Sequence, residues 1–159
     1  MKEQIDFILP SFHSETLTTL AIKSFEKFKG DFDFRYIVVE NSDDVSYKEN
    51  VLALSENVIW IQNPTTLINS EANASGLEVG LEYVTGDYVF FCHNDVVACH
   101  PEWMNFLFSK LNENEKEFGS PHTEFKNHLK RTGLIEKVRY VHIGGCVQYG
   151  LVRHLGDKV

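Results

Sequence analysis

The feature that most constrains the fold is an alternation of short apolar runs with longer segments whose apolar residues recur at helical spacing. The apolar runs, each with the length and composition of a strand, are 5–9, 34–39, 58–61 and 88–92. Segments with helix signals follow them, at 14–28, 46–54, 70–84 and 101–111. Strands that alternate with helices need crossover connections, which favour a parallel sheet. We therefore expect an α/β fold: an open, mostly parallel Rossmann-like sheet with helices on both faces.

Local signals predict where several of these elements begin and end. Pro10 should stop the first strand, Ser14 should cap the first helix, and Gly86 should end the third. Ser46 opens the pattern S-x-x-E of a capping box. A further strand is expected at 138–143. Since no repeat, linker or low-complexity tract divides the 159 residues, we expect a single domain, 1–159.

Composition excludes several classes of protein. Aromatic residues make up 13% of the chain, enough to build a core, which argues against disorder. The net charge of −8 lacks the basic surplus of a nucleic-acid binder, so no nucleic acid is expected as a partner. No apolar run approaches the roughly 20 residues of a transmembrane segment. Three cysteines without C-x-x-C spacing indicate a reducing compartment, and we expect a cytoplasmic protein.

Polar residues follow each expected strand, and they locate a candidate site. In open α/β sheets ligands bind beyond the carboxyl ends of the strands. The segments found there are 10–14, 40–44, 62–64 and 93–95, which are rich in acids, amides and hydroxyls. Neither G-x-G-x-x-G nor G-x-x-x-x-G-K-[ST] occurs in the chain, so this edge lacks a glycine-rich phosphate loop. An acidic edge can hold phosphate through a bridging Mg²⁺ or Mn²⁺.

Five motifs, in this order on these elements, resemble the family 2 glycosyltransferases of the GT-A fold. They are Ile8–Phe12, which ends the first strand in Pro-x-Phe; Val38–Asp44, which ends the second; the Asn-x-x-Gly helix, Asn73–Leu77; the run Gly86–Asp95 into a D-x-D-like position; and Trp103. The resemblance spans residues 5–111. Glu40 replaces the usual Asp, and His93 stands where the family has the first Asp of D-x-D.

The resemblance implies a function and assigns roles to residues. The chain would be a metal-dependent, inverting glycosyltransferase that takes a sugar from a nucleotide-diphosphate donor and uses Mn²⁺ or Mg²⁺. Asp95 would bind the metal with help from His93, Glu40 would contact the base or ribose, and Pro10 and Phe12 would line the base pocket. The residues implied in donor binding are Pro10, Phe12, Glu40, Asn41, Asp43, Asn73, Gly76, His93 and Asn94.

The acceptor side is less complete than the donor side. The resemblance makes 1–100 the nucleotide-sugar-binding half and 101–159 an incomplete acceptor-side half, for a sugar, lipid or protein acceptor. Asp157 is the nearest match to the family's general base, with His142 as a substitute. Two alternatives stay open: a catalytically silent GT-A-like module that binds nucleotide or sugar, and a sugar nucleotidyltransferase. The second is disfavoured because residues 10–15 lack a glycine-rich, basic stretch.

Overall fold

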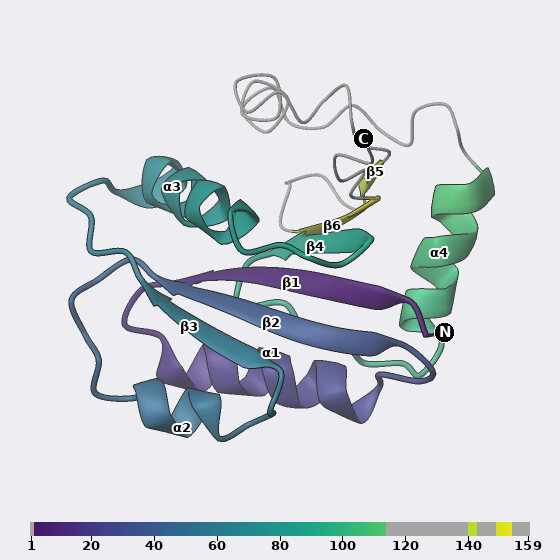
Figure 1. Cartoon of the computed structure of the whole chain (residues 1–159), viewed down its shortest axis with the longest axis horizontal. Coiled ribbons are helices and arrows are strands. Elements are labelled where there is room, and N and C mark those ends of the chain that lie inside the picture. The colour runs from purple at the N-terminus through teal and green to yellow at the C-terminus, as the bar shows by residue number, and fades with distance from the viewer. Residues whose placement is uncertain (1, 114–139, 143–148, 154–159) are drawn as a thin grey trace.

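A six-stranded sheet runs through the centre of the computed structural model, which describes residues 2–113, 140–142 and 149–153 (Figure 1). The strand order is β3-β2-β1-β4-β6-β5. The strands are β1 (Gln4–Ser11), β2 (Asp33–Glu40), β3 (Val58–Gln62), β4 (Tyr88–Cys92), β5 (Tyr140–His142) and β6 (Tyr149–Arg153). The first four are parallel, whereas β6 is antiparallel to β4 and β5 is antiparallel to β6. The predicted open, mostly parallel α/β sheet is confirmed.

Helices cover both faces of the sheet, as expected. They are α1 (Glu15–Lys27), α2 (Lys48–Leu52), α3 (Asn69–Leu81) and α4 (Trp103–Glu113). Figure 1 shows α1 and α2 on one face and α3 on the other. Leu77 of α3 packs against Ile8, Ile37 and Phe91, which alternate along their strands with the residues that face α1. In the described part of the chain, no helix is long and apolar enough to cross a membrane.

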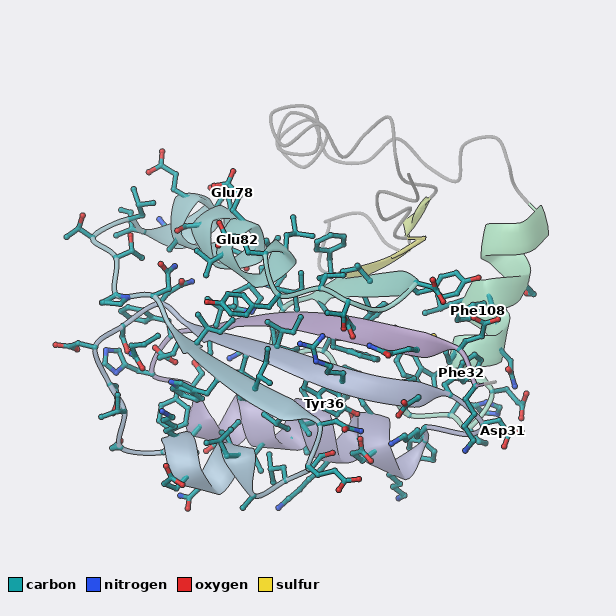
Figure 2. The ribbon with its side chains drawn as sticks, in the orientation of Figure 1. Asp31, Phe32, Tyr36, Glu78, Glu82 and Phe108 are labelled. Carbon is teal, nitrogen blue, oxygen red and sulfur yellow. The ribbon has the colours of Figure 1, made fainter. Side chains whose placement is uncertain are left out.

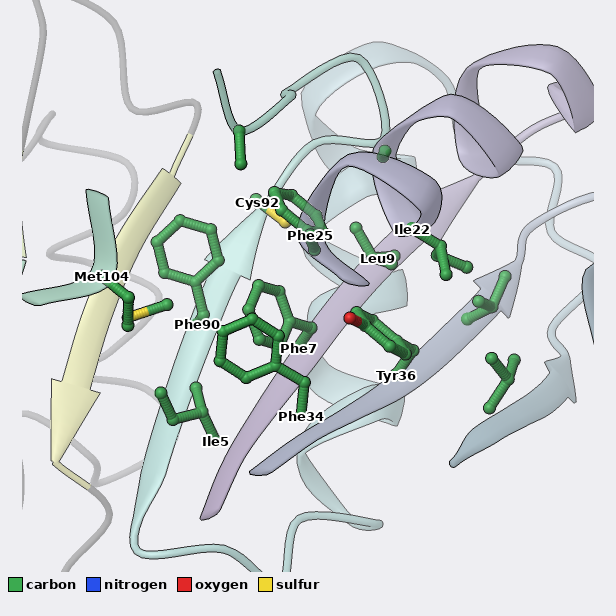
Figure 3. Close-up of a cluster of buried hydrophobic side chains, with 14 of the residues drawn as sticks. Ile5, Phe7, Leu9, Ile22, Phe25, Phe34, Tyr36, Phe90, Cys92 and Met104 are labelled. Atoms are coloured by element: carbon green, nitrogen blue, oxygen red, sulfur yellow. The ribbon is translucent and has the colours of Figure 1, made fainter. Parts of the chain in front are cut away.

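An aromatic cluster fills the space between the sheet and α1 (Figure 3). The ring of Phe7 in β1 lies 4.8–5.2 Å, between centroids, from four other rings: Phe25, Phe34, Tyr36 and Phe90. Tilted ring pairs at this distance add stabilisation beyond the area that they bury. At the edge of the cluster, Phe32 stacks on Phe108 of α4 at 5.0 Å (Figure 2). The rings therefore fix α1 and α4 on one face of the sheet.

A buried acid, Asp6, joins β1, β2 and the turn before β4 at the end of the sheet opposite the candidate site. Asp6 is fully buried in β1, and its Oδ2 accepts hydrogen bonds from the backbone N–H groups of Thr85, at 2.6 Å, and Gly86, at 2.9 Å. Arg35 of β2 pairs with the same oxygen at 3.1 Å. A Cβ on Gly86 would lie 3.0 Å from the carbonyl oxygen of Gln4, so the turn into β4 needs glycine at this position.

Three predicted boundaries were wrong. β1 continues through Pro10 to Ser11, because its pairing with β4 ends at Ile8 and no N–H is required there beyond that point. α3 ends at Leu81 rather than at Gly86, whose role is the close approach to Gln4. The last described helix begins at Trp103, two residues after Pro101.

The two predicted serine caps do not form either. Ser14 occupies the N-cap of α1, but its Oγ donates to the carbonyl oxygen of Phe12 at 2.6 Å instead of accepting from the helix. α2 begins at Lys48 with Tyr47 as its N-cap, so the capping box from Ser46 is absent. Only 3% of the surface of Tyr47 is exposed, and we attribute the start of the helix at Lys48 to the burial of this side chain.

Candidate functional site

An open pocket lies where the strand-order rule places a ligand, beyond the carboxyl ends of β1, β2 and β3. Its volume is about 380 Å³. The lining comes from the loops after these three strands: Phe12, His13, Ser42, Asp43, Pro64, Thr65 and Thr66. One aromatic ring, one imidazole, one carboxylate and three hydroxyl groups therefore surround the space, with no lysine or arginine among the lining residues.

The wall after β1 consists of two adjacent rings. Phe12 leaves 57% of its surface exposed, and its ring meets that of His13 edge-on at 4.6 Å between centroids. His13 has a backbone φ of 48°, in the left-handed region that residues with a Cβ adopt at an energetic cost. Its Nδ1 lies 3.2 Å from Oδ2 of Asp44. An exposed aromatic ring at a polar pocket is suited to stacking on a flat ligand.

The wall after β2 contributes the carboxylates. Asp43 is exposed and faces the pocket. Asp44 lies beside it, and hydrogen bonds from Ser46, followed by the one from His13, hold the pKa of its carboxyl below the ordinary value. Asp44 is therefore ionised near neutral pH, and its carboxylate accepts the Nδ1 proton of His13. In a neutral His13 ring, Nε2 is then the unprotonated nitrogen and acts as a hydrogen-bond acceptor.

Glu40, expected to contact the base or ribose, is fully buried at the end of β2. Its Oε1 accepts from the backbone N–H of His13 at 3.2 Å, the N–H of Ser42 at 3.0 Å and Oγ of Ser42 at 2.5 Å. Its Oε2 accepts from the hydroxyl of Tyr47. We call this group, the Glu40 carboxylate with its donors on His13, Ser42 and Tyr47, the Glu40 clasp. All four donors are the protein's own, so the carboxylate points into the structure rather than into the pocket.

A series of buried polar groups connects this clasp with the end of β4. The Tyr47 hydroxyl lies 3.0 Å from Oγ of Ser11, which lies 3.2 Å from Oγ1 of Thr18. Nδ2 of Asn94 donates to the same Oγ1 at 3.1 Å. Burial, and then the hydrogen bond to Glu40, raise the pKa of Tyr47 to about 12. The Tyr47 hydroxyl therefore remains protonated and donates to Glu40.

Behind the pocket, Asn41 joins the strands to α3. It is buried, its Nδ2 donates to the carbonyl oxygen of Ala72 at 2.9 Å, and its Oδ1 accepts from Nδ2 of Asn63 at 2.7 Å. A Cβ on Gly76 would lie 2.9 Å from Nδ2 of Asn41 and 3.0 Å from Cβ of Pro10. Pro10, Asn41 and Gly76, all implied in donor binding, therefore pack against one another under α3. Asn73 is half-buried on the same helix, one turn before Gly76.

The residues implied in metal binding follow β4, the neighbour of β1. Asp95 is exposed and His93 is half-buried, whereas Asn94 bonds to Thr18. Among the described residues, no group of three or more His, Cys, Asp or Glu side chains could enclose a metal ion. An exposed carboxylate such as that of Asp95 nevertheless fits Mg²⁺ or Mn²⁺ of the type that is bound by one or two protein groups and completed by substrate phosphates and water.

Two residues expected to act on the acceptor side are not tested. His142 is placed on β5, opposite Gly150 of β6, but only its backbone is described. Asp157 lies outside the described residues. The sequence analysis gave no role to His13, Tyr47, Thr65 or Thr66, although His13 lies in the inspected segment 10–14. The signal for Tyr47 is that it is an aromatic residue within the polar segment 41–50, and Thr65 and Thr66 directly follow the inspected segment 62–64.

Comparison with known proteins places this geometry in a fold. No family model matches the chain, and no curated protein sequence matches it either. Among solved structures, the mannosyltransferase PcManGT from Pyrobaculum calidifontis, in complex with GDP-Man and Mn²⁺, is similar with a TM-score of 0.62 and 12% identity, over 96% of this chain and 45% of that one. The chain has a GT-A glycosyltransferase fold.

Two further solved structures support the same assignment. The glucosyl-3-phosphoglycerate synthase of Mycobacterium tuberculosis, in complex with UDP, has a TM-score of 0.54 and 19% identity, over 96% of this chain and 57% of that one. S. aureus TarS, residues 1–349, has a TM-score of 0.51 and 20% identity, over 79% of this chain and 40% of that one. At these identities the likeness concerns the fold, and this GT-A chain spans about half the length of the proteins that it matches.

Proposed function

We propose that this chain is the donor-binding part of a metal-dependent glycosyltransferase, which transfers a sugar from a nucleoside-diphosphate donor to an acceptor. The observation that carries the proposal is the pocket at the carboxyl edge of β1, β2 and β3, with Phe12 and Asp43 exposed on its walls. The solved structures of the same fold include complexes with GDP-Man and Mn²⁺, and with UDP. The silent nucleotide- or sugar-binding module remains the second candidate, because neither candidate base is tested: only the backbone of His142 is described, and Asp157 lies outside the described residues.

The side chains on the pocket walls fit a nucleoside. Phe12 offers a ring face on which a base can stack, a contact that contributes about 1–3 kcal/mol per base in nucleic-acid complexes. Asp43 and the hydroxyl groups of Thr65 and Thr66 offer acceptors and donors for a base edge and ribose hydroxyls, whereas the Ser42 hydroxyl already donates to Glu40. Asn41 holds this wall through its carbonyl oxygen, which accepts from the N–H of Thr65 at 3.1 Å, and Pro10 and Asn41 both lie against Gly76.

The diphosphate needs a positive charge that the lining residues do not supply. Asp95, with help from His93 two positions earlier, would hold Mn²⁺ or Mg²⁺ after the end of β4, and the bound ion would neutralise charge on the leaving diphosphate. The general base of an inverting transfer would come from Asp157 or His142, and the acceptor would be a sugar, a lipid or a protein. A cytoplasmic location is likewise a proposal, supported by the free cysteines Cys92 and Cys99.

The test is calorimetric titration of the protein with UDP and GDP, each with Mn²⁺ and with EDTA. We expect tighter binding with Mn²⁺, and Asp95→Asn should remove that enhancement while the circular dichroism spectrum stays unchanged. Asp31→Asn is the matched control, because Asp31 is exposed just before β2, at the other end of the sheet (Figure 2). Equal affinity in Mn²⁺ and EDTA would contradict the metal-dependent proposal.

Turnover separates the two candidate functions. A glycosyltransferase should release nucleoside diphosphate from UDP- or GDP-sugars, and loss of its general base should lower turnover by about 10²–10⁴-fold without changing donor affinity. Asp157→Asn and His142→Gln test the two candidate bases in this way. Binding without turnover of any donor would favour the silent module.

A further inference from the structure

The Glu40 carboxylate is a buried negative charge without a cationic partner. Its side chain has no exposed surface, and no lysine or arginine in the described ranges pairs with it. Burial of an unpaired charge is unfavourable unless hydrogen bonds replace the lost water. The two N–H and two O–H groups of the Glu40 clasp supply these bonds. The carboxylate therefore fixes the positions of the segments that carry these donors.

Two of the donors belong to opposite walls of the pocket. His13 lies on the loop after β1 and Ser42 on the loop after β2, and both line the pocket. Phe12 directly precedes His13, and Asp43 directly follows Ser42. Both Phe12 and Asp43 are pocket residues with exposed side chains. We propose that Glu40 is a positioning residue that fixes the two walls relative to each other, with Tyr47 as the partner that holds its carboxylate in place. This inference rests on the proposed binding of a nucleoside diphosphate and reassigns Glu40 from contact to positioning.

The backbone of His13 supplies a physical reason for such a clasp. Its φ of 48° is unfavourable for a residue with a Cβ, and a conformation of this kind persists only when the surroundings enforce it. The hydrogen bond from its N–H to Oε1 of Glu40 is one such constraint, and the contact of its Nδ1 with Asp44 is another. Loss of the hydrogen bond from His13 to Glu40 should let the loop after β1 relax, which would change the position of Phe12 relative to Asp43.

Tyr47 separates positioning from direct contact, because it is 97% buried and is not among the pocket residues. Its ring packs edge-on against Trp60 at 5.1 Å, and its hydroxyl accepts from the N–H of Ser14 while it donates to Glu40. Tyr47→Phe keeps the ring and removes the hydroxyl, which leaves Oε2 of Glu40 buried and unpaired. If Glu40 positions the walls, this change weakens ligand binding although Tyr47 never touches the ligand.

Glu40→Gln provides the complementary variant. The amide oxygen of glutamine can accept the three bonds that Oε1 accepts now, and its NH₂ group can donate to the Tyr47 oxygen. The Tyr47 hydroxyl can then donate to Ser11, which lies 3.0 Å away. Glutamine therefore preserves the clasp and removes the charge, whereas Glu40→Ala removes both.

The experiment measures the affinity for UDP and GDP with Mn²⁺ in Glu40→Gln, Tyr47→Phe, Glu40→Ala and the double variant Glu40→Ala/Tyr47→Phe. We expect Glu40→Gln to bind within about threefold of the native protein, and Tyr47→Phe and Glu40→Ala to bind roughly tenfold or more weakly. The double variant should match Glu40→Ala, since the two residues act as one unit. Tyr83→Phe, at an exposed tyrosine far from the pocket lining, is the control and should leave affinity unchanged.

The opposite pattern would overturn the inference: a large loss in Glu40→Gln with native affinity in Tyr47→Phe would show that the charge of Glu40 contacts the ligand. Amide hydrogen exchange of His13 and Ser42, measured without ligand, provides a second readout. Both amides should be protected in the native protein and in Glu40→Gln, and should exchange faster in Tyr47→Phe. If the native protein binds neither nucleotide, the proposed function fails, and the exchange rates alone decide whether the clasp holds the two walls.

Discussion

Replacement of Gly80 by alanine should destabilise the protein, although alanine is the better helix former. Gly80 is buried in α3, where the helix crosses β1. A Cβ at this position would overlap Cγ2 of Ile8 and lie 3.4 Å from its Cβ and Cγ1. Because Cγ2 is bonded directly to Cβ of Ile8, it cannot move aside unless this fully buried side chain adopts a new χ1 rotamer. Either Ile8 or the whole helix must therefore shift.

Two opposing contributions give the magnitude. The change from glycine to alanine in a helix contributes about 1 kcal/mol of stabilisation, whereas overpacking of a core costs about 1–3 kcal/mol. Since this overlap is severe, the upper end of that range applies, and we expect a net loss of about 2 kcal/mol. For a chain of this size the loss corresponds to a fall in Tm of about 4–8 °C.

A double-mutant cycle with Ile8→Ala tests the cause. Ile8→Ala removes Cγ2 and should by itself cost about 2–5 kcal/mol. In that background Gly80→Ala meets no obstacle, so it should stabilise by about 1 kcal/mol, and the coupling between the two sites should reach about 3 kcal/mol. The assay is urea unfolding followed by circular dichroism. Stabilisation by Gly80→Ala in the native background, or equal effects in both backgrounds, would refute the packing argument.

Two further predictions concern stability. Asp6→Ala should cost about 3–5 kcal/mol in urea unfolding, because it leaves Arg35 and the N–H groups of Thr85 and Gly86 without their buried partner; Asp31→Ala, at an exposed acid, is the control and should change little. Stability should also fall as pH rises from about 10 to about 12. Folding raises the pKa of Tyr47 from 10.0 to about 12, so the stability that this group contributes is fully present below the unfolded pKa and is lost as pH rises to the folded one. Burial raises the pKa of a second tyrosine, Tyr36, as well. Unfolding followed by circular dichroism across this pH range tests the prediction, and a flat profile up to pH 12 would contradict it.

The sheet and the edge that carries the pocket could be predicted from the sequence, because they depend on periodicity and strand order. Runs such as 88–92 are apolar throughout, as a strand buried on both faces must be, and the polar segments directly after the strands mark their carboxyl ends. Tertiary packing decided what could not be predicted. Burial of Tyr47 accompanies the loss of the capping box, and early termination of the β1–β4 pairing admits Pro10 into a strand.

The direction of the Glu40 side chain was equally beyond sequence reasoning. An acid at the end of a strand can turn toward a ligand or back toward its own loop, and the choice depends on donors that folding brings near. Here those donors are the N–H of His13, 27 positions earlier, and the hydroxyl of Tyr47, seven positions later. No local pattern around position 40 contains that information.

The antiparallel pairing of β6 with β4 has a consequence for any shortened form of the protein. In a protein shortened to residues 1–100, β4 would pair only with β1. The backbone N–H and C=O groups on the other edge of this apolar strand would then lack their partners in β6. An open edge of this kind is a template for strand addition from a second molecule, and so for aggregation. β6 thus covers one edge of an apolar strand, and a shortened protein would need a substitute cover, such as a charged residue placed on that edge.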